Sequence, residues 1–217
     1  MLGGFLDRLG TQPVDDAALE AIERLMATQK PAVAPWQPVQ DYSDAGRRAI
    51  EGKNPDLVLE HLVRDGDWVL DYGCGPAAHL VRLLNQQIAA QGRPVTVLGY
   101  DPQLRRSDRH VGRAASYDVV ICREVLEHLT VRDVAATVRR LCALSDRLVY
   151  VTTRFAAAPA HLLTVDTSDD LDPTHITMLT PALLRLLFVL EGFRRRPDLE
   201  HAMDWMHKGR VLVYERA

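Results

Sequence analysis

From residue 54 onward, short apolar runs alternate with longer segments whose apolar positions repeat at helical spacing. The runs are continuous, which is typical of strands buried on both faces of a sheet. They lie at residues 69–71, 95–100, 118–122 and 147–152. We expect helices at residues 54–63, 76–90, 123–129 and 131–143, followed by a helix at 181–191 and a strand at 210–214.

This alternation predicts an α/β fold with a doubly wound, mostly parallel sheet. Two parallel strands cannot be joined by a tight turn, so each pair needs a crossover, and the helical segments supply it. A chain of 217 residues with 47% hydrophobic residues is long enough for one such domain with an extension.

Residues 1–53 have a different pattern. Apolar positions at helical spacing predict a helix over residues 15–29, and three prolines between positions 31 and 38 would end any helix. We therefore divide the chain into a helical arm with a proline-rich connector (1–53) and a main domain (54–217). The arm would either cover the functional site or serve as a packing or oligomer contact.

Charge and cysteine usage narrow the class of protein. The chain has 26 basic and 29 acidic residues, so it lacks the basic excess of a protein that binds mainly to nucleic-acid phosphates. Its cysteines, Cys74, Cys122 and Cys142, form no paired motif and are expected to be reduced thiols. No apolar run approaches the ~18 residues of a membrane span, and no signal peptide is evident. We expect a soluble, cytoplasmic protein with no membrane partner.

The candidate chemistry begins at the end of the first run, with Asp71-Tyr72-Gly73-Cys74-Gly75-Pro76. Glycines allow a loop to adopt positive φ and leave room for the backbone to approach a ligand. The second run ends at Asp101, where a carboxylate can accept hydrogen bonds from both hydroxyls of a ribose. The two strand ends therefore predict a nucleotide-like cofactor.

Three segments together resemble the class I S-adenosylmethionine-dependent methyltransferases. They are the acidic-x-Gly-x-Gly motif at Asp71, the segment 117–129 with its Glu-Val-Leu-Glu-His-Leu, and the late helix ending at Gly192-Phe193. The resemblance covers residues 55–217 and implies a Rossmann-like sheet with an antiparallel C-terminal edge strand. It implies S-adenosyl-L-methionine as cofactor, with Asp71, Gly73, Cys74, Gly75, Asp101, Pro102, Cys122 and Arg123 as its binding residues.

The chain departs from that family in one place. Only 15 residues separate Asp101 from Tyr117, too few for the helix and third strand that the family has there. We expect a loop in their place and a sheet of six strands where the family has seven. The residue that contacts adenine from the third strand is then missing.

A second group of residues suggests where the reaction takes place. On a helix at 123–129, Glu124, Glu127 and His128 would share one face. His175 lies in the long loop after the strand at 147–152, and we expect all four side chains to converge at the carboxyl edge of the sheet.

Three interpretations of this group remain open. Glu124, Glu127, His128 and His175 could bind a divalent metal ion, as they resemble methyltransferases that modify the 3′ ends of small RNAs or catechol-like ubiquinone precursors. His128 or His175, with Glu124, could instead be catalytic residues, a histidine being the general base. A third interpretation is that they only stabilise a helix end and a loop.

The leading functional hypothesis is methyl transfer from S-adenosylmethionine to an oxygen of a small or end-accessible acceptor. A metal-dependent RNA 3′-end 2′-O-methyltransferase is one alternative, although the charge balance makes nucleic acid a less favoured partner. A catalytically inactive methyltransferase-like fold, acting as a nucleotide-binding or protein-interaction module, is the other. The sequence leaves the oligomeric state open.

Overall fold

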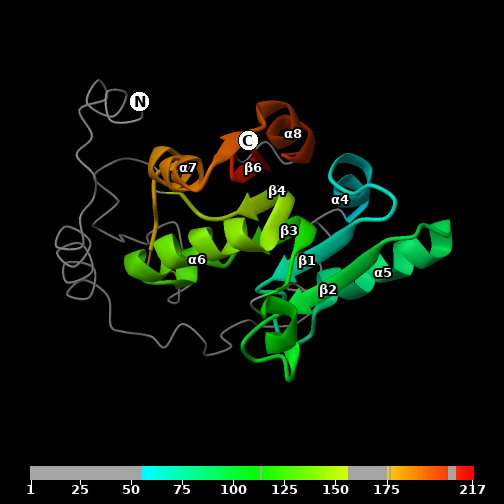
Figure 1. The fold of residues 1–217 in the computed structure, drawn as a ribbon. Coiled ribbons are helices and arrows are strands. Elements are labelled where there is room, and N and C mark those ends of the chain that lie inside the picture. Colours follow the sequence, from blue (N-terminus) through cyan, green and yellow to red (C-terminus); the bar gives the residue numbers. More distant parts are fainter. Residues whose placement is uncertain (1–54, 113, 156–174, 176, 205–208) are drawn as a thin grey trace.

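The computed structural model describes residues 55–112, 114–155, 175, 177–204 and 209–217. It contains one six-stranded sheet with helices on both faces (Figure 1). The strands are β1 (Trp68–Tyr72), β2 (Thr96–Tyr100), β3 (Tyr117–Arg123), β4 (Ser145–Thr152), β5 (Phe193–Arg195) and β6 (Val211–Arg216). The helices are α4 (Pro55–His61), α5 (His79–Gln91), α6 (Val131–Leu144), α7 (Pro181–Leu190) and α8 (Pro197–Met203), with short 3-10 helices η2 (Ser107–Val111) and η3 (Leu126–His128).

The order of strands across the sheet is β2-β1-β3-β4-β6-β5. The first four are parallel, and β6 and β5 add an antiparallel edge. The predicted fold class is therefore confirmed, including the antiparallel C-terminal strands. The described residues after β2 form only the short helix η2 before the chain enters β3, so the expected loop and the six-stranded sheet are found. The predicted arm, residues 1–53, lies outside the described residues.

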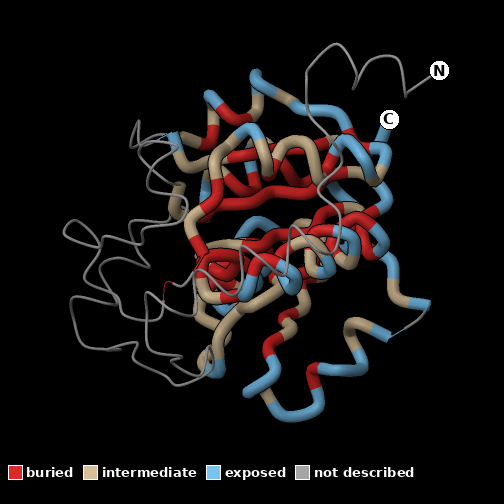
Figure 2. The backbone as a smooth tube through the Cα atoms, turned by 90° about the vertical axis from the view of Figure 1, so that its left-hand side faces the viewer, coloured by how far each residue is buried: buried red, intermediate tan, exposed pale blue. Residues whose placement is uncertain are grey.

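Two apolar layers hold the sheet between its helices. On one face, α6 and α7 pack through residues such as Val138 and Phe188 against β1, β3, β4 and β6. On the other face, α4, α5 and α8 pack through residues such as Val58 and Leu84. Figure 2 shows the buried backbone concentrated in this sheet and the exposed backbone at the outer turns. No helix among the described residues is long and apolar enough to cross a membrane.

The helix predicted over residues 123–129 is wrong. The backbone N–H of Glu124 donates to the carbonyl of Thr152 on β4 (2.8 Å), and Glu124 has a left-handed φ of 51°. A residue with a left-handed φ cannot begin a right-handed helix, and the hydrogen bond to β4 holds Glu124 in this conformation. Only the 3-10 turn η3 forms, so Glu124 does not share a helical face with Glu127 and His128.

The outer edge of the sheet is closed by side chains where a third strand would pair. The carbonyl of Val97 on β2 accepts from the amide of Asn85 (3.2 Å), and the carbonyl of Gly99 accepts from Nδ1 of His110 (2.8 Å). Exposed strand edges invite pairing with other chains, and such occupied carbonyls reduce that risk. His110 lies in η2, so the shortened segment itself supplies half of this protection.

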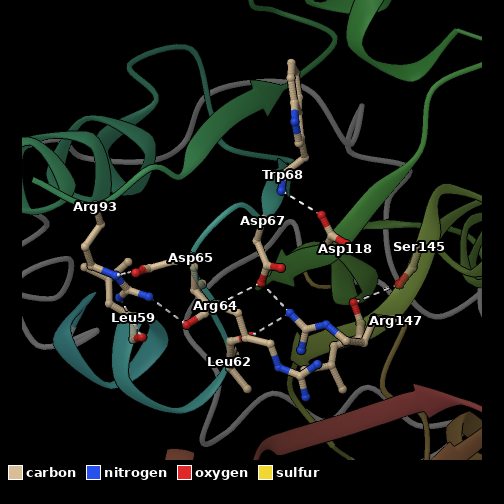
Figure 3. A network of polar contacts seen from close by, with 12 residues as sticks. Leu59, Leu62, Arg64, Asp65, Asp67, Trp68, Arg93, Asp118, Ser145 and Arg147 are labelled. Atoms are coloured by element: carbon tan, nitrogen blue, oxygen red, sulfur yellow. Dashed lines mark hydrogen bonds and ion pairs between the residues drawn. The ribbon is translucent and has the colours of Figure 1, made fainter.

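Polar contacts at the amino edge of the sheet fix α4 and the turn after it (Figure 3). The buried side chains of Asp67 and Arg147 form an ion pair, and Arg147 also donates to the carbonyl of Leu62 (3.2 Å). Arg93 donates to the carboxylate of Asp65 (2.7 Å) and to the carbonyls of Leu59 and Val63. These contacts anchor the end of the sheet opposite the candidate site.

Candidate functional site

The glycine turn after β1 has the geometry that its sequence predicts. Gly73 and Gly75 have φ values of 80° and 71°. The N–H groups of Gly73 and Cys74 donate to the carbonyl of Tyr100 (2.7 and 3.0 Å), which ties the turn to the end of β2. A Cβ on Gly73 would lie 2.4 Å from Cγ2 of Val125, so the turn accepts no side chain there.

Asp101 closes the same loop from the second strand end. Its carboxylate accepts hydrogen bonds from the N–H groups of Gly75 (3.0 Å) and Gln103 (2.8 Å), and the residue is only 7% exposed. The hydroxyl of Ser107 donates to the carbonyl of Asp101 (2.7 Å). Asp71 at the end of β1 is also buried. Both predicted carboxylates are thus buried at neighbouring strand ends, and that of Asp101 is fixed by hydrogen bonds.

Cys74 has a protonated, unreactive thiol. Burial raises its pKa to about 12, and the negative charges of Asp71 and then Asp101 act in the same direction. Its sulfur packs under β2, where a Cβ on Gly99 would lie 2.8 Å away. We conclude that Cys74 shapes the loop and is not a nucleophile.

Beside this loop lies a cavity of about 430 Å³ between the ends of β1 and β2 and the helix α6. This volume is within the usual range for ligand pockets. Its lining includes Tyr72, Gly73, Tyr100, Pro102, Val125 and Arg140. The rings of Tyr72 and Tyr100 form one wall, with centroids 4.8 Å apart and planes inclined by 49°.

Sequence reasoning missed the two tyrosines and the contribution of α6 to this cavity. Tyr72 and Tyr100 occupy the last positions of adjacent strands. Their places at the two predicted strand ends could have identified them from the sequence as residues near the cofactor. Burial raises the pKa of Tyr72 to about 12, so its hydroxyl is neutral near physiological pH. The part played by α6 depends on packing and has no local sequence signal.

The predicted residues at the end of β3 lie on opposite faces of the sheet. Cys122 is fully buried in the core against α6, so its side chain contacts no solvent and burial raises its pKa well above the usual value. Arg123, the next residue, is partly exposed. Pro102 is exposed at the rim of the cavity.

The structure brings together three members of the second group. The rings of His128 and His175 meet edge to face, with centroids 4.7 Å apart and planes at 65°. Ligand atoms of Glu127, His128 and His175 lie within 4.8 Å of one another. The N–H of Thr177 donates to the carbonyl of Glu127 (3.1 Å), so the late loop is bonded directly to η3. The predicted convergence of the two histidines is confirmed.

Glu127 is completely buried, and this changes its chemistry. One carboxylate oxygen, Oε2, accepts from the hydroxyl of Thr153 (2.9 Å), while Oε1 has no hydrogen-bond partner among the described residues. Burial raises the pKa of Glu127 well above its usual range, and the adjacent Glu124 raises it further. A buried oxygen in this state is stabilised by a proton or by a cation.

Glu124 differs from the expectation. It is not one of the three residues whose ligand atoms lie within 4.8 Å of one another, but its carboxyl interacts with that of Glu127 and also faces the guanidinium of Arg154 at 4.0 Å. Its strained backbone is nevertheless informative, because left-handed non-glycine residues cluster at functional sites. The other residues predicted around His175, at 172–174 and 176, lie outside the described part of the chain.

Comparison with known protein families gives a match over most of the chain. A family model described as a methyltransferase domain matches residues 45–196. No curated protein matches.

Similar solved structures include magnesium protoporphyrin IX methyltransferase from Synechocystis PCC 6803 with bound SAH (19% identity, 80% of this chain and 84% of that chain, TM-score 0.49). A putative methyltransferase in complex with the Haloferax volcanii Trm112 activator has 14% identity over 80% of this chain and 94% of that chain, with a TM-score of 0.49. Both scores are below 0.5, so the family assignment depends on the matched family model.

Proposed function

The chain belongs to the methyltransferase-domain family, as a class I S-adenosylmethionine-dependent methyltransferase, and on this premise we propose that it methylates an oxygen of a small or end-accessible acceptor. The observation that carries the proposal is the pairing of His128 with His175 next to the buried carboxyl of Glu127. An imidazole with a usual pKa near 6.5 is suited to removing a hydroxyl proton near neutrality.

In this proposal the glycine turn and Asp101 hold S-adenosylmethionine. The backbone of Gly73 and Gly75 approaches its methionine part, and the carboxylate of Asp101 accepts from the ribose hydroxyls. The cavity between Tyr100 and α6 receives the adenine, which the missing third strand would otherwise contact. Bound in this way, S-adenosylmethionine supplies an electrophilic methyl group.

The remaining work of the protein is alignment. Methyl transfer is an in-line displacement, so the acceptor oxygen must be held at near-attack distance and kept away from water. His128 or His175 takes the acceptor proton, and Thr177 fixes the loop that carries His175 through its bonds to Glu127 and Leu129. Glu127 lies under the imidazoles and orients them.

A divalent metal ion would also fit this group. One carboxylate oxygen and two imidazole nitrogens are common ligands of first-row transition metals, and the unpartnered Oε1 of Glu127 is suited to a cation. Glu127, His128 and His175 would hold the ion. It would act as a Lewis acid on the acceptor oxygen. Glu124 is the weakest of the four predicted ligands, because it is not among the three residues whose ligand atoms lie together.

The first test is calorimetric titration of the protein with S-adenosylhomocysteine. Saturable binding is expected, and its absence would favour the alternative of an inactive methyltransferase-like fold. Methyl transfer from labelled S-adenosylmethionine is then measured on a panel of catechol-type acceptors and on a short RNA.

The second test separates the base from the metal. With a histidine base, EDTA leaves the rate unchanged, and His128→Ala or His175→Ala lowers it by about 10²–10⁴-fold. With a metal, EDTA abolishes the rate and a divalent ion restores it. Activity that survives both histidine substitutions and EDTA would contradict the proposed role of this group. Preference for the RNA together with EDTA sensitivity would support the RNA 3′-end alternative.

A further inference from the structure

Arg123, at the carboxyl end of β3, has an incompletely satisfied guanidinium. Its Nε and Nη1 atoms are buried and have no hydrogen-bond partner among the described residues. Buried polar groups are nearly always bonded, and a buried donor without a partner costs free energy that increases when the group is charged. Such donors in a folded protein therefore require an explanation.

Several other arginines of the domain have polar partners, although Arg154 and Arg185 each keep one buried Nε atom without a partner among the described residues. Arg147 pairs with Asp67, Arg195 pairs with Glu200 (2.5 Å), and Arg216 donates to the carbonyls of Cys142 and Ser145. Arg123 has no ion pair of this kind among the described residues. Packing alone does not require a guanidinium at this position, because the neighbouring core is built from apolar side chains.

Arg123 pairs with β4 at the carboxyl end of the sheet. It lies opposite Thr152 in the β3–β4 register, two residues beyond the pair formed by Ile121 and Tyr150. Its positive charge acts on the hydroxyl of Tyr150, lowering a pKa that burial otherwise raises. The glycine turn and Asp101 belong to β1 and β2, on the other side of β3. Because side chains alternate along a strand, Arg123 lies on the face of Ile121 and not on the face of Cys122, which packs against α6.

A second arginine extends this positive region. Arg154 lies two residues after the end of β4, and its Nε atom is likewise buried without a hydrogen-bond partner among the described residues. The carboxylate of Glu124, at 4.0 Å, is close enough for an ion pair but too far for a hydrogen bond. Glu124 directly follows Arg123 in the chain, so the carboxylate nearest to Arg154 comes from the residue next to Arg123.

We propose that Arg123, assisted by Arg154, binds an oxyanion of the methyl acceptor, a carboxylate or a phosphate. This inference depends on the proposed function and specifies its substrate class. A planar guanidinium with two free donors is suited to bidentate binding of such a group. The acceptor is then anchored over β3 and β4, beside the turn η3 that carries Glu127 and His128. Arg123 is thus a specificity-determining residue for the acceptor.

The oxyanion bound by Arg123 could also come from the cofactor, whose methionine part carries a carboxylate. The two sources are separated by titrating Arg123→Met with S-adenosylhomocysteine, which carries that carboxylate, and with 5′-methylthioadenosine, which lacks it. We expect both affinities to stay within about twofold of the parent protein. Loss of S-adenosylhomocysteine binding alone would assign Arg123 to the cofactor and overturn the proposal.

The acceptor side is tested on protein saturated with S-adenosylhomocysteine, using benzoate, phenyl phosphate and the neutral benzamide as probes. We expect at least one anion to bind the parent protein about tenfold more tightly than benzamide, and Arg123→Met to remove this preference. Arg123→Lys should keep part of it, because the charge remains and the planar fork is lost.

Arg139→Met is the matched control, since Arg139 is exposed on α6 and pairs with Glu191. It should leave the preference intact. Equal binding of the anions and benzamide to the parent protein, or an unchanged preference in Arg123→Met, would overturn the proposal. Failure of the parent protein to bind S-adenosylhomocysteine would instead contradict the proposed function, which keeps the two outcomes distinct.

Discussion

The carboxylate of Asp101 accepts a hydrogen bond from the backbone N–H of Gly75 across 3.0 Å. This bond joins the ends of β1 and β2, so the residue expected to hold the ribose also holds the glycine turn. Cofactor binding and loop geometry are therefore linked through one side chain.

Asp101→Asn tests this link. The amide keeps the shape of the side chain but loses one acceptor oxygen and the negative charge, so binding of S-adenosylhomocysteine should weaken by about 1.5–3 kcal/mol. Calorimetric titration measures the change. Asp108→Asn, at an exposed position of η2 with the same change of charge, is the control and should bind normally. Equal affinities of the two variants would refute our placement of the ribose.

Gly73→Ala should destabilise the domain and prevent cofactor binding. A left-handed alanine costs about 1–2 kcal/mol, and the contact of its Cβ with Val125 adds about 1–3 kcal/mol of overpacking. Gly92→Ala has a similar φ of 64° and no atom within 4 Å of the added Cβ, so it should show the backbone cost alone. Chemical denaturation compares the two variants, and equal losses would mean that Val125 moves aside freely.

Ala136→Trp should fill the cavity beside α6 without disturbing the core, because Ala136 is an exposed lining residue. We expect binding of S-adenosylhomocysteine to weaken by roughly tenfold or more, as the bulky ring occupies the space assigned to adenine. Ala182→Trp, exposed on α7, should have no effect on affinity. Unchanged binding by Ala136→Trp would exclude this cavity as the adenine site.

Cys74 should react slowly with iodoacetamide. Only the thiolate reacts, and a pKa raised to about 12 leaves almost no thiolate at pH 8. The alkylation rate should rise about tenfold per pH unit from pH 8 and continue to rise beyond pH 9, where an ordinary thiol is already ionised. Asp101→Asn removes a nearby negative charge, lowers the pKa and should speed the reaction. Mass spectrometry identifies the labelled cysteine, and a rate that levels off near pH 9 would contradict the raised pKa.

The sequence by itself determined the parallel sheet and the cofactor loop, because both depend on local patterns. An apolar run such as the one before Asp71 predicts a buried strand without reference to the rest of the fold. The turn that follows requires a positive φ, and this favours glycine at position 73. The 15-residue interval after Asp101 limited the sheet to six strands, because no helix and strand fit within it.

Tertiary structure decided the conformation and the surroundings of the second group. Glu124 has the local pattern of a helix start, but its N–H stays bonded to Thr152 of β4, and this long-range bond outweighs helical propensity. The cavity beside Tyr72 and Tyr100 depends on the packing of α6 opposite the ends of two strands. The donors of Arg123 that have no partner among the described residues likewise depend on the tertiary structure, because a missing partner leaves no pattern in the sequence.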